Sequence, residues 1–478
     1  MAYETRGKGQ VRPFANAVRR TLSTSWPLAL ENVAVAVNGL ITAAFLSNDS
    51  AAAVTAVLTS STLAGIFSAF FTAVFGYSGT IVARRFGGGR SADAVRVFGQ
   101  GLVLTFASLP LFLSAIPAGW LALSAFGHSS ATFSAEKDYF TLLMVAGFLS
   151  VLAQVLAGLF TGQGKTRFVG IIMTLGVVLN AGLTPAFVSG TPHPSIAGVC
   201  GAGTAAILSN GMVAAVLAIR VAFDPLIRGS RGIISFDRGI AAEILIVGLP
   251  NGLRHLVDSA GFFIFVAMIA RLDPMSVAAS TAVFAINNLH HSFAIGVSAA
   301  TEILTGRNLG ADRADAVRAD VNAALAITAA SLALFAAVLA LLGETMLGWF
   351  LPSNCVESSA FFRTGHGLYL VLALKLPIEI PLVILAGTLR GLGDTSFIFK
   401  DQSFVSFAVW LPLGFAVNTL HPTVTALWLT MVVSSAFTAG LFVRHYTFIV
   451  TTHAASRGAF HLPPAANNTV NRAARYVR

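Results

Sequence analysis

The chain has 478 residues, of which 55% are hydrophobic and only 10% are charged. Soluble domains carry about 25% charged residues, so this composition excludes a string of ordinary soluble domains. It indicates that lipid, not water, surrounds most of the protein.

Twelve apolar segments follow one another along the chain. A helix needs about 20 mostly apolar residues to cross the hydrocarbon core of a bilayer, and these runs are too long for the strands of a membrane barrel. The sequence therefore predicts an all-α polytopic membrane protein with twelve transmembrane helices. The predicted spans are 25–46, 52–78, 97–121, 139–161, 167–188, 196–222, 239–269, 277–304, 321–343, 366–389, 402–420 and 423–444.

The 30 Lys and Arg residues gather on one side of this topology. With a cytoplasmic N-terminus, 25 of them lie in inner segments, and the outer loops hold only Lys137, Arg271 and Arg363. The remaining two, Arg254 and Lys375, fall inside spans. This asymmetry follows the positive-inside rule, so we expect both termini to be cytoplasmic. The net charge of +10 is then explained by basic residues at the inner membrane surface, and not by binding of a nucleic acid. The first apolar run is too long for a cleavable signal peptide.

The chain contains an internal repeat. Residues 81–96 (IVARRFGGGRSADAVR) align with 303–318 (ILTGRNLGADRADAVR), and both follow the second helix of a six-helix half. Residues 156–169 (LAGLFTGQGKTRFV) align with 385–398 (LAGTLRGLGDTSFI), and both follow the fourth. The repeat predicts two homologous six-helix bundles in the same orientation, an architecture typical of secondary transporters.

The repeat also predicts the domain limits. We expect a cytoplasmic tail over residues 1–22, an N-terminal lobe over 23–222, a charged cytoplasmic linker over 223–238, a C-terminal lobe over 239–449 and a second tail over 450–478.

The repeated motifs carry a family resemblance. The two Gly- and Arg-rich loops, the Arg-Gly-Leu-Gly-Asp-Thr motif at 390–395 and Gly248-Leu249-Pro250 together resemble the multidrug and toxic compound extrusion (MATE) family, bacterial type, over about residues 20–450. The resemblance implies a two-lobed carrier in the inner membrane and not an enzyme. Such a carrier would export organic, often cationic, compounds in exchange for protons or sodium ions. It would need no cofactor beyond the coupling ion, and a monomer would suffice.

Three acidic residues are candidates for ion coupling. A charge inside a span costs several kcal/mol, from about 2.5 upward, so such residues are functional candidates by default. The resemblance places Asp258 in the seventh helix, Glu379 in the tenth and Asp394 in the Arg-Gly motif. A desolvated carboxylate can exchange a proton or supply oxygen ligands for a hard cation. The alternative for Asp394 is a charge at a helix end at the membrane surface.

The N-terminal lobe departs from the family. Many members carry an Asp in the first helix and another four residues after an Asn in the fifth. This chain keeps the Asn as Asn180, but Thr42 and Thr184 stand at the acidic positions. Glu31 is the one acid inside a predicted span of this lobe, and it either takes part in the site or lies near the inner membrane interface.

Two basic residues share helix faces with the acids. Arg254 lies four residues before Asp258, and Lys375 lies four before Glu379. Residues four apart lie on one helix face, so each acid is expected to pair with a cation. Two interpretations follow: structural ion pairs, or a charge-balanced site in which the substrate or a proton competes for the carboxylates. His255 is either a titrating neighbour or a packing residue.

Two further features, the segment 162–166 and the two cysteines, need no special function. The segment 162–166 (GQGKT) ends like a phosphate-binding loop, but Leu159 stands where the first Gly is needed, so no ATP site is expected. Cys200 and Cys355 lack the spacing of metal ligands, and two unpaired thiols are expected.

Two other function classes compete with the exporter. A lipid or lipid-linked-sugar flippase of the same superfamily would use Arg254 and Lys375 to hold a phosphate. A membrane-embedded enzyme or channel is the third candidate, because the sequence shows no convincing catalytic or metal cluster and no repeat typical of a channel's selectivity filter.

Overall fold

The computed structural model describes the backbone of residues 5–47, 51–190, 198–229, 233–351 and 358–455. Within these ranges the side chains of residues 5–13, 40–47, 51–55, 358 and 450–455 are not described. Cys355 lies outside the described residues, and Cys200 on α8 is a free thiol.

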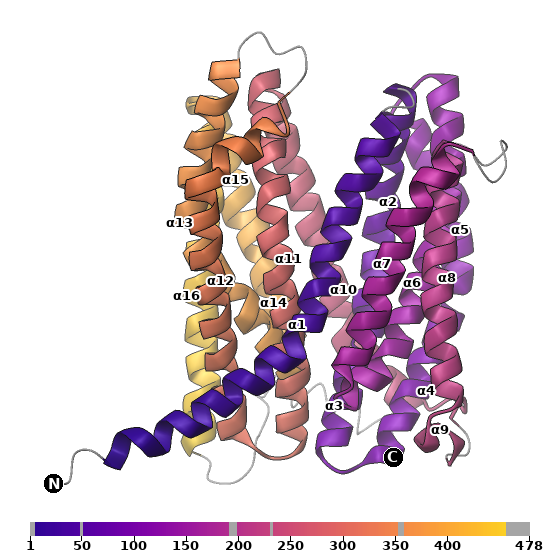
Figure 1. The fold of residues 1–478 in the computed structure, drawn as a ribbon, viewed down its shortest axis with the longest axis vertical. Coiled ribbons are helices and arrows are strands. Elements are labelled where there is room, and N and C mark those ends of the chain that lie inside the picture. The colour runs from indigo at the N-terminus through magenta and orange to yellow at the C-terminus, as the bar shows by residue number, and fades with distance from the viewer. Residues whose placement is uncertain (1–4, 48–50, 191–197, 230–232, 352–357, 456–478) are drawn as a thin grey trace. The chain divides into compact units, whose positions relative to one another are not determined.

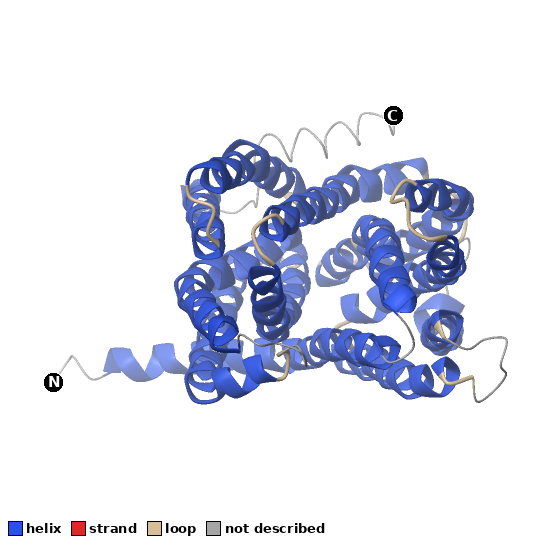
Figure 2. Cartoon of the chain, turned by 90° about the horizontal axis from the view of Figure 1, so that it is seen from above, coloured by secondary structure: helices blue, strands red, loops and turns tan. Residues whose placement is uncertain are grey.

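The described chain is built from helices joined by short turns (Figures 1 and 2). Capping residues mark several of the helix starts: side-chain oxygens of Ser129, Asp224 and Asp394 accept backbone N–H groups at the starts of α6, α9 and α14. The helices are α1 Thr5–Ser47, α2 Ala51–Gly76, α3 Ser78–Gly87, α4 Ser91–Ala107, α5 Leu109–Ser124, α6 Ser130–Gly162, α7 Thr166–Val188, α8 Val199–Ala222, α9 Pro225–Arg228, α10 Arg238–Ala270, α11 Pro274–Gly310, α12 Ala314–Gly348, α13 Ser358–Leu392, α14 Thr395–Phe404, the π-helical turn η2 Val405–Trp410, α15 Leu411–Leu420 and α16 Val424–Ala455.

Ten helical stretches of the described chain are long and apolar enough to cross a membrane. Three of them are composite, joining α2 to α3, α4 to α5, and α14 through η2 to α15. The long helices α1 and α11 complete the set of twelve. α11 is less apolar because it carries paired Asn and His residues and ends in charged ones. The prediction of an all-α membrane protein with twelve spanning helices is confirmed.

The chain forms two compact units. The C-unit comprises the described residues up to Ala29, Leu256–Thr305 and the described residues from Arg313 onward. The N-unit comprises Leu30–His255 and Gly306–Asp312.

Three helices belong to both units: α1, α10 and α11, whose last residues from Gly306 to Gly310 lie in the N-unit. α10 contributes Ile244 to a buried cluster of the N-unit and Phe265 to the main core of the C-unit. In α1, Arg20 forms an ion pair with the buried Asp320 of α12, within the C-unit. Farther along α1, Asn38 bonds to α7 within the N-unit. The first helix of each half is therefore a continuous covalent link from one unit to the other.

The internal repeat is visible as close helix contacts at equivalent glycines. A Cβ on Gly162 would lie 3.0 Å from the backbone N of Ala83, and one on Gly391 would lie 2.6 Å from Cβ of Thr305. These pairs occupy matching positions in the two repeats. The turns that follow also match, because Gly164 has φ +84° and Gly393 has φ +90°, a conformation that favours glycine. The predicted duplication is confirmed in the fold.

The Gly-rich loops of the two repeats pack on one another within the N-unit. A Cβ on Gly87 would lie 1.9 Å from the carbonyl oxygen of Arg307, and one on Gly310 would lie 1.9 Å from that of Arg84. The contact is reciprocal, as expected of duplicated segments that meet. These glycines are therefore needed for close backbone approach.

We predict that Gly87→Ala and Gly310→Ala each lower the stability of the purified protein by about 1–3 kcal/mol, because the added methyl group forces two backbones apart. Thermal unfolding in detergent measures the effect. Gly182→Ala in α7 is the matched control, since nothing lies within 4 Å of a Cβ built there. An unchanged melting temperature for Gly87→Ala would contradict this account of the loop contact.

Candidate functional site

The tenth spanning helix carries a buried ion pair. On α13, Nζ of Lys375 lies 2.7 Å from Oε2 of Glu379, with side-chain exposures of 8% and 20%. The helix is unbroken through Pro377 and Pro381, which flank Glu379. The expected pairing at spacing four is confirmed here. Because both charges face one helix surface, the pair is neutral as a whole and its cost in lipid falls.

Two histidines of α11 extend this pair. His290 and His291 are both close enough to Glu379 for an electrostatic interaction. His290 lies face to face with Phe335, and its Nε2 is 3.3 Å from Oγ of Ser331 on α12. These histidines were not among the predicted site residues, although two adjacent His residues inside an apolar run indicate a polar site within a span.

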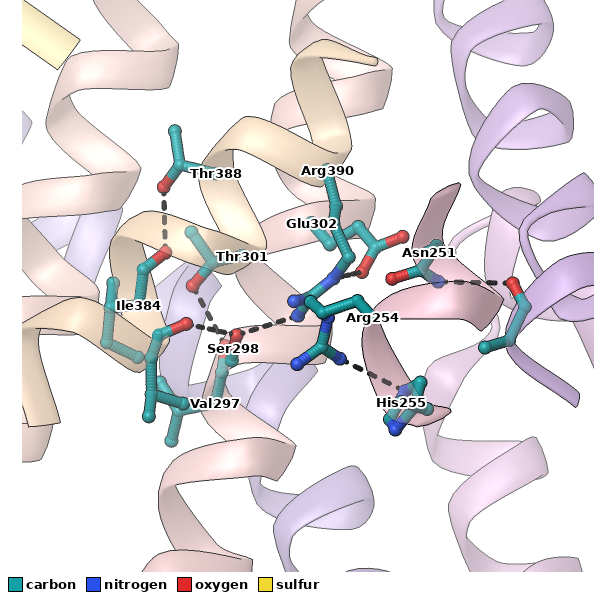
Figure 3. A network of polar contacts seen from close by, with 12 residues as sticks. Asn251, Arg254, His255, Val297, Ser298, Thr301, Glu302, Ile384, Thr388 and Arg390 are labelled. Carbon is teal, nitrogen blue, oxygen red and sulfur yellow. Dashed lines mark hydrogen bonds and ion pairs between the residues drawn. The ribbon is translucent and has the colours of Figure 1, made fainter. Parts of the chain in front are cut away.

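A second ion pair lies further along the same two helices (Figure 3). Nε of Arg390 donates to Oε2 of Glu302 at 2.8 Å, and its Nη2 donates to Oγ of Ser298 at 3.1 Å. Ser298 in turn donates to the carbonyl of Val383 at 2.6 Å. The motif arginine therefore ties α13 to α11. Glu302 was missed because it stands at the end of a predicted span.

Asp394 has structural partners. It is 7% exposed, and its Oδ1 accepts the backbone N–H of Phe397 at 3.3 Å, which caps α14. Its Oδ2 lies 2.7 Å from Nε2 of His445 on α16. Asp394 is thus buried and paired. At 1.5 Å per residue it lies about 20 Å from Glu379 along the helix axis, so the two acids belong to separate places in the C-unit.

The candidates on α10 lie on either side of the unit boundary. Arg254 and His255 belong to the N-unit, where Nη2 of Arg254 is 3.0 Å from Nε2 of His255 (Figure 3). One turn earlier, Asn251 donates to the carbonyl of Ala73 at 3.1 Å. Asp258 is half-buried and belongs to the C-unit. Its pairing with Arg254 stays a prediction.

The candidates of the first half gather on α1 and α7. Nδ2 of Asn38 donates to Oδ1 of Asn180 at 2.9 Å, which joins the two helices. Thr184 is 1% exposed and donates to the carbonyl of Asn180 at 2.8 Å, so its hydroxyl satisfies the backbone of its own helix. Glu31 is half-buried on α1. An amide pair therefore joins α1 to α7 one turn from Thr184, which stands where the resemblance places an acid.

The described residues contain no group of three or more His, Cys, Asp or Glu side chains suited to holding a metal ion. Lys165, the lysine of the GQGKT segment, is 3.4 Å from Oδ2 of Asp224, an aspartate that Arg220 also approaches at 3.7 Å. Lys165 therefore belongs to an ion-pair cluster between the C-terminus of α8 and the N-terminus of α9.

Comparison with known proteins identifies the family. The MatE family model matches residues 27–186 and 250–419, which is well over half of the chain. A multidrug resistance protein NorM of Pseudomonas putida is 27% identical over 342 residues, which cover 70% of this chain and 72% of that protein. One from Deinococcus radiodurans is 25% identical over 349 residues, covering 71% and 74%.

Solved structures agree on the fold. A crystal structure of a MATE protein in complex with MaL6 superposes with a TM-score of 0.81 at 20% identity, covering 91% of this chain and 97% of that one. A MOP superfamily transporter from Pyrococcus furiosus, described as having a binding pocket of reversed polarity, gives 0.80 at 20% identity, covering 91% and 96%. The match of the family model over both halves shows that this chain belongs to the MatE family of membrane transporters, which are not enzymes.

Proposed function

We propose that the chain is a secondary antiporter that exports organic, often cationic and amphiphilic, small molecules in exchange for protons or sodium ions. The observation that carries the proposal is the buried Lys375–Glu379 pair, within electrostatic range of two histidines, in a chain whose relatives are named multidrug resistance proteins. Carboxylates and imidazoles are the groups that exchange protons near neutral pH.

In this proposal the lobes are residues 23–222 and 239–449, joined by the linker 223–238, with tails over 1–22 and 450–478. Both termini face the cytoplasm of a bacterial inner membrane, which agrees with the basic inner loops. A single chain carries both lobes and acts as a monomer.

The proposed mechanism is a competition for carboxylates. With Lys375 at 2.7 Å, Glu379 is charge-balanced without any ligand. A proton, a sodium ion or a cationic substrate near Glu379 would displace the ammonium group. For exchange to occur, ion and substrate must bind the two conformational states with different affinities. Asp258 on α10 is the second proposed carboxylate, and Asp394, which caps α14 and lies beside His445, is the third. Arg254, Glu31 and Asn180 are proposed as charge-balancing or substrate contacts.

We predict that Glu379→Gln and Asp258→Asn each reduce ethidium export at least tenfold in cells that express them at wild-type levels, because each removes a carboxylate that exchanges a cation. Export is followed by fluorescence, with and without a proton uncoupler and with and without sodium. Glu344→Gln, on an exposed acid of α12, is the control and should export normally. Full export by both site variants would contradict the coupling role of these residues.

A double variant separates the two interpretations of the ion pair. The double variant Lys375→Gln/Glu379→Gln removes both charges, and neutral replacement of a buried ion pair is often tolerated. If the pair only stabilises the fold, this variant should therefore recover the export that is lost in the single variants. We predict instead that the double variant folds, with a melting temperature at or above that of the single variants, yet exports nothing. Recovered export would reduce the pair to a structural role.

The flippase remains the alternative function. Lys375 is engaged with Glu379, which leaves less basic charge free for a phosphate. Movement of a fluorescent anionic phospholipid between the leaflets of vesicles containing the purified protein, together with no ethidium export, would favour the flippase.

A further inference from the structure

An acidic residue outside the proposed site has no evident role. Asp401 lies on α14, in the second turn after the Asp394 cap, and is only 6% exposed. Both of its carboxylate oxygens are buried, and within the described structure neither accepts a hydrogen bond. By contrast, Glu379, Glu302 and Asp394 each have a cation, a cap or an imidazole beside them.

An ionised carboxylate in this position would be strongly unfavourable. Burying a charge without partners costs far more than burying a neutral polar group, and in proteins such a group is neutralised instead. Native structures leave very few buried polar atoms unsatisfied, so each exception requires an explanation. The described residues form no metal-binding cluster, which leaves the proton as the simplest neutralising ligand.

An imidazole connects Asp401 to Asp394. His445 on α16 is close enough to Asp401 for an electrostatic interaction. Its Nε2 is already 2.7 Å from Oδ2 of Asp394, and its ring stacks on Phe397 at a centroid distance of 3.7 Å and an angle of 9°. Stacking and hydrogen bond together fix the ring, so its second nitrogen, Nδ1, is left as a proton acceptor.

The other titratable groups on the elements packed against α14 are accounted for. Arg390 of α13 is engaged with Glu302, and Lys400 of α14 and Arg444 of α16 are exposed. Tyr446 of α16 interacts electrostatically with Arg318. His445 is therefore the group best placed to exchange a proton with Asp401.

We propose that Asp401 carries a proton and that Asp401, His445 and Asp394 form a proton-binding cluster of the C-unit, separate from the Lys375–Glu379 pair. When the Asp401 carboxyl releases its proton, Nδ1 of His445 takes it up while its Nε2–H stays donated to Asp394. The imidazolium then lies between two carboxylates, and the cluster keeps its total charge. A part for this cluster in ion coupling rests on the proposed antiport, whereas the proton on Asp401 does not.

Infrared difference spectroscopy of the purified full chain tests the proposal, because a protonated carboxyl group has its own C=O stretching band. We expect such a band near neutral pH in the wild type and its complete loss in Asp401→Asn. The matched control is Asp320→Asn, which removes another buried aspartate, one that is paired with Arg20, and should leave the band in place. His445→Gln removes the proposed proton acceptor, so the pH at which the band disappears should change.

The outcomes are distinct. An Asp401→Asn spectrum identical to the wild type at every pH would overturn the proposal, and so would loss of the band in Asp320→Asn alone. Should Asp401→Asn fail to fold, Asp401→Glu keeps a carboxyl group, and the band should move in frequency instead of vanishing.

Ethidium export from cells that express the same variants separates this inference from the proposed function. Loss of the band together with a tenfold or greater loss of uncoupler-sensitive export supports a coupling role, and unchanged export overturns that role. A wild type that shows the band but exports nothing would contradict the antiporter and leave the proton site standing.

Discussion

The structure depends on one constraint, which is that a charge inside a membrane-spanning helix must be neutralised. In the C-unit this is met by pairs that join neighbouring helices or neighbouring turns: Lys375 with Glu379, and Arg390 with Glu302. These pairs fix the polar interior of α11 and α13. They also define what transport would require, because any ligand that binds such a carboxylate has to replace the cation already there.

A second constraint comes from the covalent chain. α1, α10 and α11 each begin in one compact unit and end in the other, with the boundaries after Ala29, after His255 and after Thr305. Any change in the relation between the units must therefore act on these three helices. Arg254 and Asp258 lie within one turn of the α10 boundary. The predicted pairing of these two residues would be sensitive to such a change.

The sequence predicted the fold well because lipid imposes long apolar runs and because duplication leaves matching motifs. It also predicted the Lys375–Glu379 pair, since spacing on a helix is a local property. It missed Glu302 and Asp401, which fall within two residues of predicted span ends, where boundaries are least certain. His445 and Asp394 are 51 positions apart, and the amide pair Asn38–Asn180 is 142 apart. Such contacts depend on packing and have no local signature.

The central claim is that outward movement of a substrate is exchanged for an ion bound at carboxylates of the C-unit. Purified protein in vesicles that contain a trapped pH indicator tests it directly, with ethidium added in sodium-free buffer and then in buffer with sodium. The account predicts that ethidium dissipates an imposed proton or sodium gradient with wild-type protein and fails to do so with Glu379→Gln. Ethidium transport at the wild-type rate with neither ion moving would contradict it.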